Sequence, residues 1–375
     1  MNRTRAMLQE AKGIIDIMKP IKEPCVPCGI SIFKGTGWTC FLNASMQCLS
    51  HCSDISQMVC HQFDGMMSHL VKNTNDNKYH VLACTTLHTL REVLSRYIIV
   101  NATYLIDLVC EKAEFQHGQQ QDAYECIQVL LEQLSLSLAR SKHADPMLSF
   151  DKIDPEELVS IGLKSLPGTH SIIDDIFGGQ TINVRVCLSC NELYGKIENF
   201  RGLTLPFPAV PSEQWDVAIN LTDMLTRFTV ATRLDDFRCK CSEQNSVTQV
   251  KIWTPPRILI LMMNRFIYVY DQERGYNGYL KVTIPVRYPE KLDLSDYMGN
   301  DAHSSEYKLF SVCCHIGSHS SGHYYTCAKD EHTGKWYVFS DSEHTECSVD
   351  DVLHRTGPAY ILFYKRTDDT GFVKV

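Results

Sequence analysis

Apolar residues in the first half of the chain recur every three or four positions, a spacing that places them on one face of a helix. Two runs show this spacing clearly: Leu87, Leu90, Leu94, Tyr97 and Ile98, and then Ala123, Ile127, Leu130, Leu131, Leu134 and Leu138. Asp122 and Glu125 stand at the start of the second run with the spacing of a capping box. The pattern predicts a helical first half, with one helix beginning just after Asp122.

After about residue 176 the apolar runs become short, aromatic and β-branched, which is typical of strands. Five segments are predicted as strands: 257–266, 307–316, 323–328, 335–340 and 359–365. Turn residues at 318–322 and 330–334 separate three of them. A block of helices followed by a block of strands favours an α+β fold with a mostly antiparallel sheet in the second half.

The composition is that of an ordinary globular protein, with 44% hydrophobic and 21% charged residues among 375 and a net charge of −8. These values exclude a disordered chain and a strongly basic nucleic-acid binder. No apolar stretch is long enough to span a bilayer, and the N-terminus lacks the apolar region of a secretory signal. The 17 cysteines are therefore expected to be free thiols in an intracellular compartment, cytoplasm or nucleus.

Cys40 is the first candidate catalytic residue. It stands in GTGWTCFLNASM (35–46), where a glycine-containing loop leads into a helical pattern. A thiol at a helix N-terminus feels the positive end of the helix dipole, so a lowered pKa and a reactive thiolate are expected. A buried structural role fits most of the cysteines, but the position of Cys40 and a downstream histidine favour a nucleophile.

His323 is the candidate base. It follows a glycine- and serine-rich loop and begins a predicted strand, while Ser340 and Asp341 follow the end of the next strand. This arrangement suits a base and its orienting partner. His315 and His319 are weaker candidates on the same loop. A metallohydrolase or a nucleotide-using enzyme is disfavoured, because the chain has no H-E-x-x-H, P-loop or dinucleotide motif.

Four segments in order resemble motifs of the ubiquitin-specific protease family, the papain-like cysteine deubiquitinases. They are TCFLNASMQCL (39–49), GQQQDAYECIQVLLEQL (118–134), PPRILILMMNRF (255–266) and the histidine-containing segment 307–342. The resemblance implies a papain-like fold with thumb, palm and fingers over residues 30–366, after a leader (1–29) and before a tail (367–375). It also implies that Cys40 is the nucleophile, that His323 is the base, and that catalysis needs no cofactor. The expected partners are ubiquitin or ubiquitinated proteins and an activating protein. Binding to nucleic acid or to a membrane is not expected.

The chain departs from the family pattern at two catalytic support positions. The asparagine that family members usually carry five residues before the nucleophile, as a donor to the oxyanion, is Gly35 here. The backbone N–H of Cys40 remains available as a donor. The family's third residue, an aspartate or asparagine, is Ser340 here, with Asp341 next, and both stay open as the group that orients His323.

A third departure concerns metal. Family members often bind structural zinc through two C-x-x-C pairs; here the first pair is Cys187 and Cys190, but the second is the tighter pair Cys239 and Cys241. Two alternatives stay open: the four cysteines bind zinc, or the tip of the fingers is held by packing without metal. The pair Cys25 and Cys28 has no obvious partner pair, and a structural role is expected for it.

Three functions remain in competition at this point. The leading one is a thiol isopeptidase that cleaves after the C-terminal glycine of ubiquitin. The second is a ubiquitin-binding pseudoenzyme, which the departures at Gly35 and Ser340 favour. The third keeps the chemistry but replaces ubiquitin by a ubiquitin-like modifier.

Overall fold

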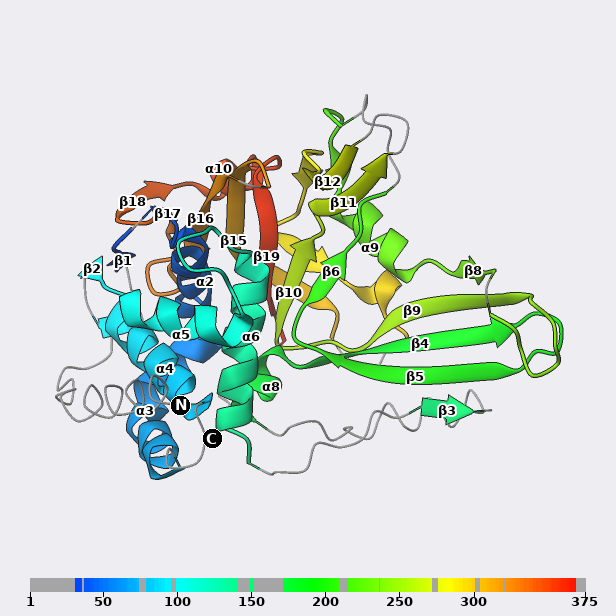
Figure 1. Ribbon diagram of the computed structural model, residues 1–375, viewed down its shortest axis with the longest axis horizontal. Helices are drawn as coiled ribbons and strands as arrows, with labels where there is room; N and C mark the ends of the chain where they lie inside the picture. Colours follow the sequence, from blue (N-terminus) through cyan, green and yellow to red (C-terminus); the bar gives the residue numbers. More distant parts are fainter. Residues whose placement is uncertain are drawn as a thin grey trace. The chain divides into compact units, whose positions relative to one another are not determined.

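The computed structural model in Figure 1 describes residues 31–35, 37–73, 79–95, 99–140, 149–151, 171–208, 215–235, 237–271, 276–300, 304–319 and 321–368. The chain divides into two compact units. The first comprises residues 1–139, 323–348 and 372–375, and the second comprises residues 140–322 and 349–371. The expected leader, 1–29, lies outside the described residues, as do Cys25, Cys28 and most of the expected tail.

The first unit combines the helices of the first half with three strands from the second half. Its helices are α2 (Cys40–Ser50), α3 (Ser53–Asn73), α4 (Tyr79–Ser95), α5 (Thr103–Ala113) and α6 (Ala123–Ser137). Its strands are the short parallel pair β1 (Ile32–Phe33) and β2 (Ile99–Val100), and the antiparallel run β16 (Gly322–Lys329), β17 (Trp336–Ser340) and β18 (Glu343–Cys347). The α+β class expected from the sequence is confirmed.

Helix α2 is the buried centre of the first unit, and every one of its residues is buried. Its polar side chains are satisfied internally: Ser45 donates to the carbonyl of Ala123 at the start of α6, at 3.1 Å. Thr326 of β16 donates to the carbonyl of Ala44 at 2.9 Å. Because buried hydroxyls need a partner, these bonds hold α2 in one register against α6 and β16.

Helix α6 begins where the sequence predicts. The carboxylate of Asp122 accepts hydrogen bonds from the backbone N–H groups of Tyr124 and Glu125, at 2.7 and 3.0 Å. This N-cap fixes the chain direction directly after residues 118–121, so it also fixes where that short segment runs. The other predicted helix, α4, ends at Ser95 in the described part of the chain, while Tyr97 and Ile98 lie outside it.

The second unit is mostly antiparallel sheet. Five strands form the sheet β3-β5-β4-β9-β8, with bounds Ser149–Asp151, Leu193–Phe200, Gly179–Cys187, Ser246–Thr254 and Thr232–Leu234. A further group pairs β6 (Leu203–Leu205), β10 (Ile258–Met263), β19 (Ala359–Arg366), β15 (Glu306–Gly317) and β14 (Lys291–Asp293). The remaining elements are β7 (Ile219–Asn220), β11 (Phe266–Asp271), β12 (Tyr276–Lys281), β13 (Val286–Arg287), η2 (Ser295–Tyr297) and the helices α8 (Ile172–Phe177), α9 (Leu221–Thr229) and α10 (Val349–Leu353).

The predicted strand 257–266 is interrupted by a buried arginine. Arg265 is 0% exposed, and its guanidinium donates to the carbonyls of Ala359, Val282 and Ile284 at 2.7–3.0 Å and to that of Thr356 at 3.2 Å. Burial lowers the pKa of Arg265 to about 10, so it stays charged at neutral pH. Backbone carbonyls from several separate segments thus accept hydrogen bonds from one buried cation. The strand is interrupted between β10 and β11, where the side chain of Arg265 reaches these carbonyls.

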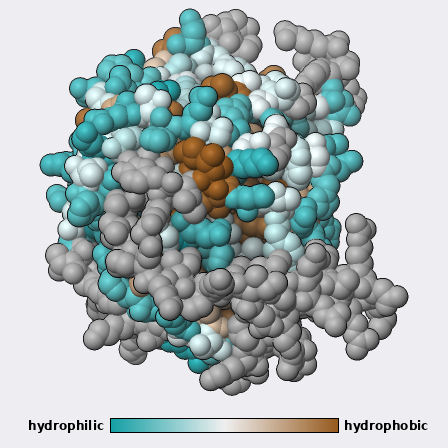
Figure 2. All heavy atoms as spheres, turned by 90° about the vertical axis from the view of Figure 1, so that its left-hand side faces the viewer, coloured by the Kyte–Doolittle hydropathy of each residue, from teal (hydrophilic) through white to brown (hydrophobic). Residues whose placement is uncertain are grey.

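The described surface carries few large apolar side chains. Among the residues that Figure 2 colours by hydropathy, hydrophilic ones predominate on this face, and a patch of apolar ones lies near its centre. Among the described helices, none is long and apolar enough to cross a membrane. Fourteen of the described cysteines are free thiols, but Cys60 is disulfide-bonded, so the expectation of free thiols throughout is wrong at that residue.

Candidate active site and cysteine cluster

Cys40 is the first residue of α2, as the loop-to-helix pattern predicts, with Thr39 as the N-cap residue. The loop before it turns at Gly37, whose φ of +83° lies in the left-handed region that glycine adopts without strain. Only 2% of Cys40 is exposed. The thiol therefore sits at a helix start, but inside the protein rather than at its surface.

The expected lowering of the Cys40 pKa is wrong in sign. Burial raises the pKa of the thiol above its ordinary value, and the nearby Asp341 carboxylate raises it further. The backbone N–H groups of Tyr324, Phe41 and Cys40 itself act in the opposite direction. Desolvation of the charged form outweighs the helix start, so the thiolate needs a base to take its proton.

His323 and Ser340 are in direct contact. The Nε2 atom of His323, at the start of β16, lies 2.8 Å from the hydroxyl of Ser340, at the end of β17. The two strands pair antiparallel, which brings the start of one beside the end of the other. Of the two open candidates, Ser340 is the one that contacts the imidazole. The other ring nitrogen, Nδ1, is not in contact with Ser340.

The strand that contains His323 also reaches Cys40. The backbone of Tyr324, the residue directly after His323, is within hydrogen-bonding reach of the Cys40 sulfur. Since Thr326 of the same strand is bonded to α2, the backbone on both sides of this contact is held in place. The strand that contains His323 thus lies beside Cys40, although the two segments come from distant parts of the chain.

Asp341 turns away from His323. One carboxylate oxygen accepts a hydrogen bond from Nδ2 of Asn43 in α2 at 2.8 Å. Its backbone has a φ of +47°, and its carbonyl accepts from the N–H of Phe33 at 3.1 Å. The side chain is therefore fixed beside α2, and no hydrogen bond between Asp341 and the imidazole is found among the described residues.

Gln120 is a residue that the sequence analysis did not single out. Its Nε2 lies 3.9 Å from the Cys40 sulfur. It precedes the N-cap Asp122 by two residues, so the start of α6 places it. The only sequence signal was its place in GQQQDAYE, in which three glutamines in a row gave no reason to choose one.

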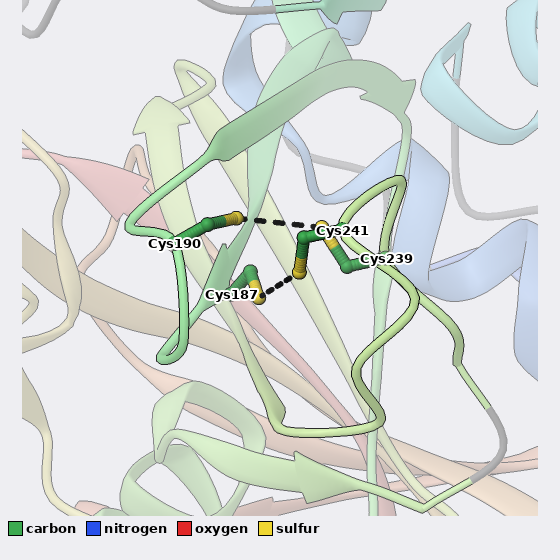
Figure 3. Close-up of side chains that lie close together, drawn as sticks. All are labelled: Cys187, Cys190, Cys239 and Cys241. Atoms are coloured by element: carbon green, nitrogen blue, oxygen red, sulfur yellow. Dashed lines mark hydrogen bonds between the residues drawn. The ribbon is translucent and has the colours of Figure 1, made fainter.

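The four cysteines proposed as metal ligands form one cluster in the second unit. Figure 3 shows the side chains converging, Cys187 and Cys190 from the end of β4 and the turn after it, and Cys239 and Cys241 from the segment between β8 and β9. All four sulfurs lie within 4.8 Å of one another. Cys187 and Cys241 are 3.7 Å apart and Cys190 and Cys239 are 3.6 Å apart, sulfur to sulfur.

Comparison with known proteins agrees with these observations. Residues 33–364 match the family model described as "Ubiquitin carboxyl-terminal hydrolase". The chain belongs to this family. Among curated members, it is 25% identical over 346 residues to ubiquitin carboxyl-terminal hydrolase 2 of Homo sapiens, covering 90% of this chain, and 27% identical over 371 residues to ubiquitin carboxyl-terminal hydrolase 21 of Mus musculus, covering 88%.

This family member spans only part of those relatives, 55% of the first and 61% of the second. Among solved structures, it resembles a chain of the SAGA DUB module of Ubp8, Sgf11, Sus1 and Sgf73 bound to monoubiquitin, with a TM-score of 0.69 and 23% identity over 95% of this chain and 74% of that one. The same module bound to ubiquitin aldehyde gives a TM-score of 0.68 at 21% identity, over 97% of this chain and 75% of that one. These likenesses support the fold.

Proposed function

We propose that this chain is a thiol-dependent deubiquitinase that hydrolyses the isopeptide bond after the C-terminal glycine of ubiquitin. The observation that carries the proposal is the placement of Cys40 at the start of α2, with the backbone next to His323 at its sulfur and Ser340 on the imidazole. A thiol at a helix start, a neighbouring strand with an imidazole near its start, and a hydroxyl on that imidazole support a thiol nucleophile with a histidine base. A free thiol nucleophile also suits the reducing, intracellular setting expected from the sequence.

The reaction starts with proton transfer from the Cys40 thiol to His323. Since Nε2 is engaged by Ser340, Nδ1 takes this proton. The sulfur bonds to the carbonyl carbon, whose oxygen becomes an oxyanion. The carbon–nitrogen bond then breaks, and His323 returns the proton to the departing lysine amine. Water then attacks the thioester and gives one proton to His323. The carbon–sulfur bond breaks, which frees the Cys40 thiolate, and the ubiquitin carboxylic acid loses the second proton to solvent.

The oxyanion needs donors that do not depend on residue 35. The backbone N–H of Cys40 at the start of α2 is one, and the amide of Gln120 beside the sulfur is the second in this proposal. A side-chain donor at this place would take over the role of the family's asparagine, whose position is occupied by Gly35 in this chain. The neutral hydroxyl of Ser340 orients the imidazole without adding charge.

Replacing Gln120 with alanine should lower kcat for a ubiquitin–fluorophore amide by about 10²-fold, with little change in KM, since the donor acts on charge that develops in the transition state. Steady-state kinetics check this. Gln121→Ala is the matched control: the neighbouring amide donates to the carbonyl of Gln116 instead and should leave kcat unchanged. A Gln120→Ala enzyme as fast as the wild type would assign the oxyanion to other donors.

The proposed function is tested with a ubiquitin probe that carries an electrophile at its C-terminus. The wild-type chain should form a covalent adduct, and peptide mass spectrometry should place it on Cys40. Cys40→Ala should stay unlabelled while keeping its melting temperature. A wild-type chain that remains unlabelled, under conditions in which another active thiol deubiquitinase reacts fully, would refute the proposal.

A pseudoenzyme is the second candidate, and the glycine at position 35 is the observation that favours it. It predicts ubiquitin binding without turnover, and binding that survives Cys40→Ala. Cleavage that is lost in Cys40→Ala removes this candidate. Parallel probes built on ubiquitin-like modifiers decide whether ubiquitin itself is the substrate. A stimulating partner remains a prediction, checked by adding candidate proteins to the same assay.

A structural zinc ion is proposed for the cysteine cluster. Four thiolates at about 2.3 Å from a tetrahedral zinc are about 3.8 Å apart. The sulfur pairs at 3.6 and 3.7 Å are close to that value, even though Cys239 and Cys241 form the shorter C-x-C pair. The cluster lies apart in sequence from Cys40 and has no step in the reaction.

A further inference from the structure

The loop that precedes His323 is closed at its neck by two glycines that touch. A Cβ atom added to Gly317, whose φ is +95°, would lie 2.7 Å from Cα of Gly322. A Cβ atom added to Gly322 would overlap Nε2 of His315, a side chain that is only 3% exposed. Carbon atoms in contact normally stay about 3.5–4.0 Å apart, so only glycine fits at either position. A shift of residues 315–317 is therefore passed to Gly322, and through one peptide bond to His323.

The two-stranded hairpin of β11 and β12 presents one face with three aromatic rings and a cation (Figure 1). Phe266 lies opposite Lys281, and Tyr268 lies opposite Tyr279. Residues directly opposite each other in an antiparallel pair share a face, and so do residues two positions apart along a strand. These four side chains therefore lie on the same side, which we call the hairpin face.

Lys281 fastens the neck of the loop to the hairpin face. Its Nζ atom donates to the carbonyl of His315 at 2.8 Å and to that of Gly317 at 3.1 Å. Burial and the nearby charge of Arg265 lower the pKa of Lys281 to about 8, so the ammonium form predominates at neutral pH. Hydrogen bonds from a charged donor are stronger than those between neutral groups. One side chain thus holds both residues against which Gly322 packs.

Tyr279 fastens the loop at a second point. Its ring stacks on the ring of His319, with centroids 4.6 Å apart and planes 6° apart. The ring of Phe266 contacts His319 edge-on at 5.7 Å and His315 at 5.3 Å. Such ring pairs attract beyond the apolar area that they bury. Tyr279 is 54% exposed and His319 is exposed too, so this pair belongs to the loop rather than to the core.

We propose that the hairpin face positions the base: Lys281 and Tyr279 hold the loop 317–322 at its neck and at its tip, and so fix where His323 lies. The proposal rests on the proposed deubiquitinase function. Both are positioning residues, since they act through the loop and not on the reacting atoms. The two other histidines of this segment then support the loop and transfer no proton.

The first test removes the donor at the neck. Lys281→Met should lower kcat for a ubiquitin–fluorophore amide about tenfold with little change in KM. Alkylation of Cys40 by iodoacetamide, followed by peptide mass spectrometry, should slow by the same factor, because this reagent depends on the base but not on ubiquitin. Lys281→Arg keeps a charged donor and should restore most of both rates. Lys291→Met removes an exposed lysine of the same unit and should change neither.

The second test breaks the ring stack. Tyr279→Ala and His319→Ala should each lower kcat about threefold. The double variant should be no slower than the slower single variant, because both remove the same contact. Tyr279→Phe keeps the ring and should retain most of the rate, and Leu280→Ala, on the opposite face of β12, is the control with an unchanged rate. Melting temperatures of these exposed variants should match wild type, and they carry the conclusion if Lys281→Met fails to fold.

The outcomes separate this proposal from the proposed function. Loss of kcat and of Cys40 alkylation together, with rescue by Lys281→Arg, supports both. A change confined to KM, with normal alkylation, makes the hairpin face a substrate contact; it overturns the positioning role and leaves the deubiquitinase standing, as does a normal kcat in every variant. A wild-type chain that neither cleaves nor is labelled by the ubiquitin probe refutes the proposed function and the positioning role with it.

Discussion

Replacing His323 with alanine should lower kcat/KM for a ubiquitin–fluorophore amide by about 10³–10⁴-fold at neutral pH, equivalent to about 4–5.5 kcal/mol of transition-state stabilisation. In the proposed mechanism the imidazole takes the thiol proton and returns it to the leaving amine. In the described structure the imidazole contacts the hydroxyl of Ser340. Burial has raised the pKa of Cys40, so without the imidazole the sulfur stays protonated at neutral pH.

The pH dependence of that variant gives a second readout. The thiolate fraction of a group with a raised pKa grows as pH rises toward that pKa. The residual rate of His323→Ala should therefore climb steadily through the alkaline range. The wild-type enzyme, which has a base for the thiol, should depend less steeply on pH there. His332→Ala, at an exposed histidine in the turn after β16, should behave like wild type. A His323→Ala enzyme with a normal rate and profile would show that another base serves Cys40.

Replacing Cys239 with serine should remove bound zinc and lower the melting temperature by at least about 5 °C. The cluster ties the end of β4 to the segment between β8 and β9, and metal binding to such a site contributes directly to folding free energy. In a domain of about 150–250 residues, each kcal/mol lost lowers the melting temperature by about 2–4 °C. Elemental analysis of purified protein and thermal unfolding with and without a chelator measure both effects.

Cys347→Ser is the matched control, because Cys347 is a free cysteine outside the cluster. It should keep the zinc and its response to the chelator. Purified wild-type protein without zinc, and with a melting temperature that no chelator changes, would instead favour the metal-free tip that the sequence left open. The chemistry at Cys40 tests the deubiquitinase proposal independently of either result.

Local patterns predicted the elements well where the cause is local. The capping spacing at Asp122 located the start of α6, and the turn residues located the ends of β15 to β17. The single strand predicted over 257–266 is wrong at its end, because the strand stops before Arg265. The hydrogen-bond acceptors of this side chain come from residues near 282 and 359, which the local pattern does not contain. Helix α9 was not predicted from the pattern of its nine residues.

The sequence by itself determined the α+β class, the family motifs, the start of a helix at Cys40 and the four cysteines able to meet around a metal. Each depends on spacing along the chain. The tertiary structure decided what no spacing contains. Burial reversed the expected direction of the Cys40 pKa, since desolvation depends on what packs around the sulfur. The turn after β17 also placed Ser340 against the imidazole of His323, and Asp341 against Asn43 and Gly35. Backbone torsions, which no spacing along the chain contains, set the direction of each side chain.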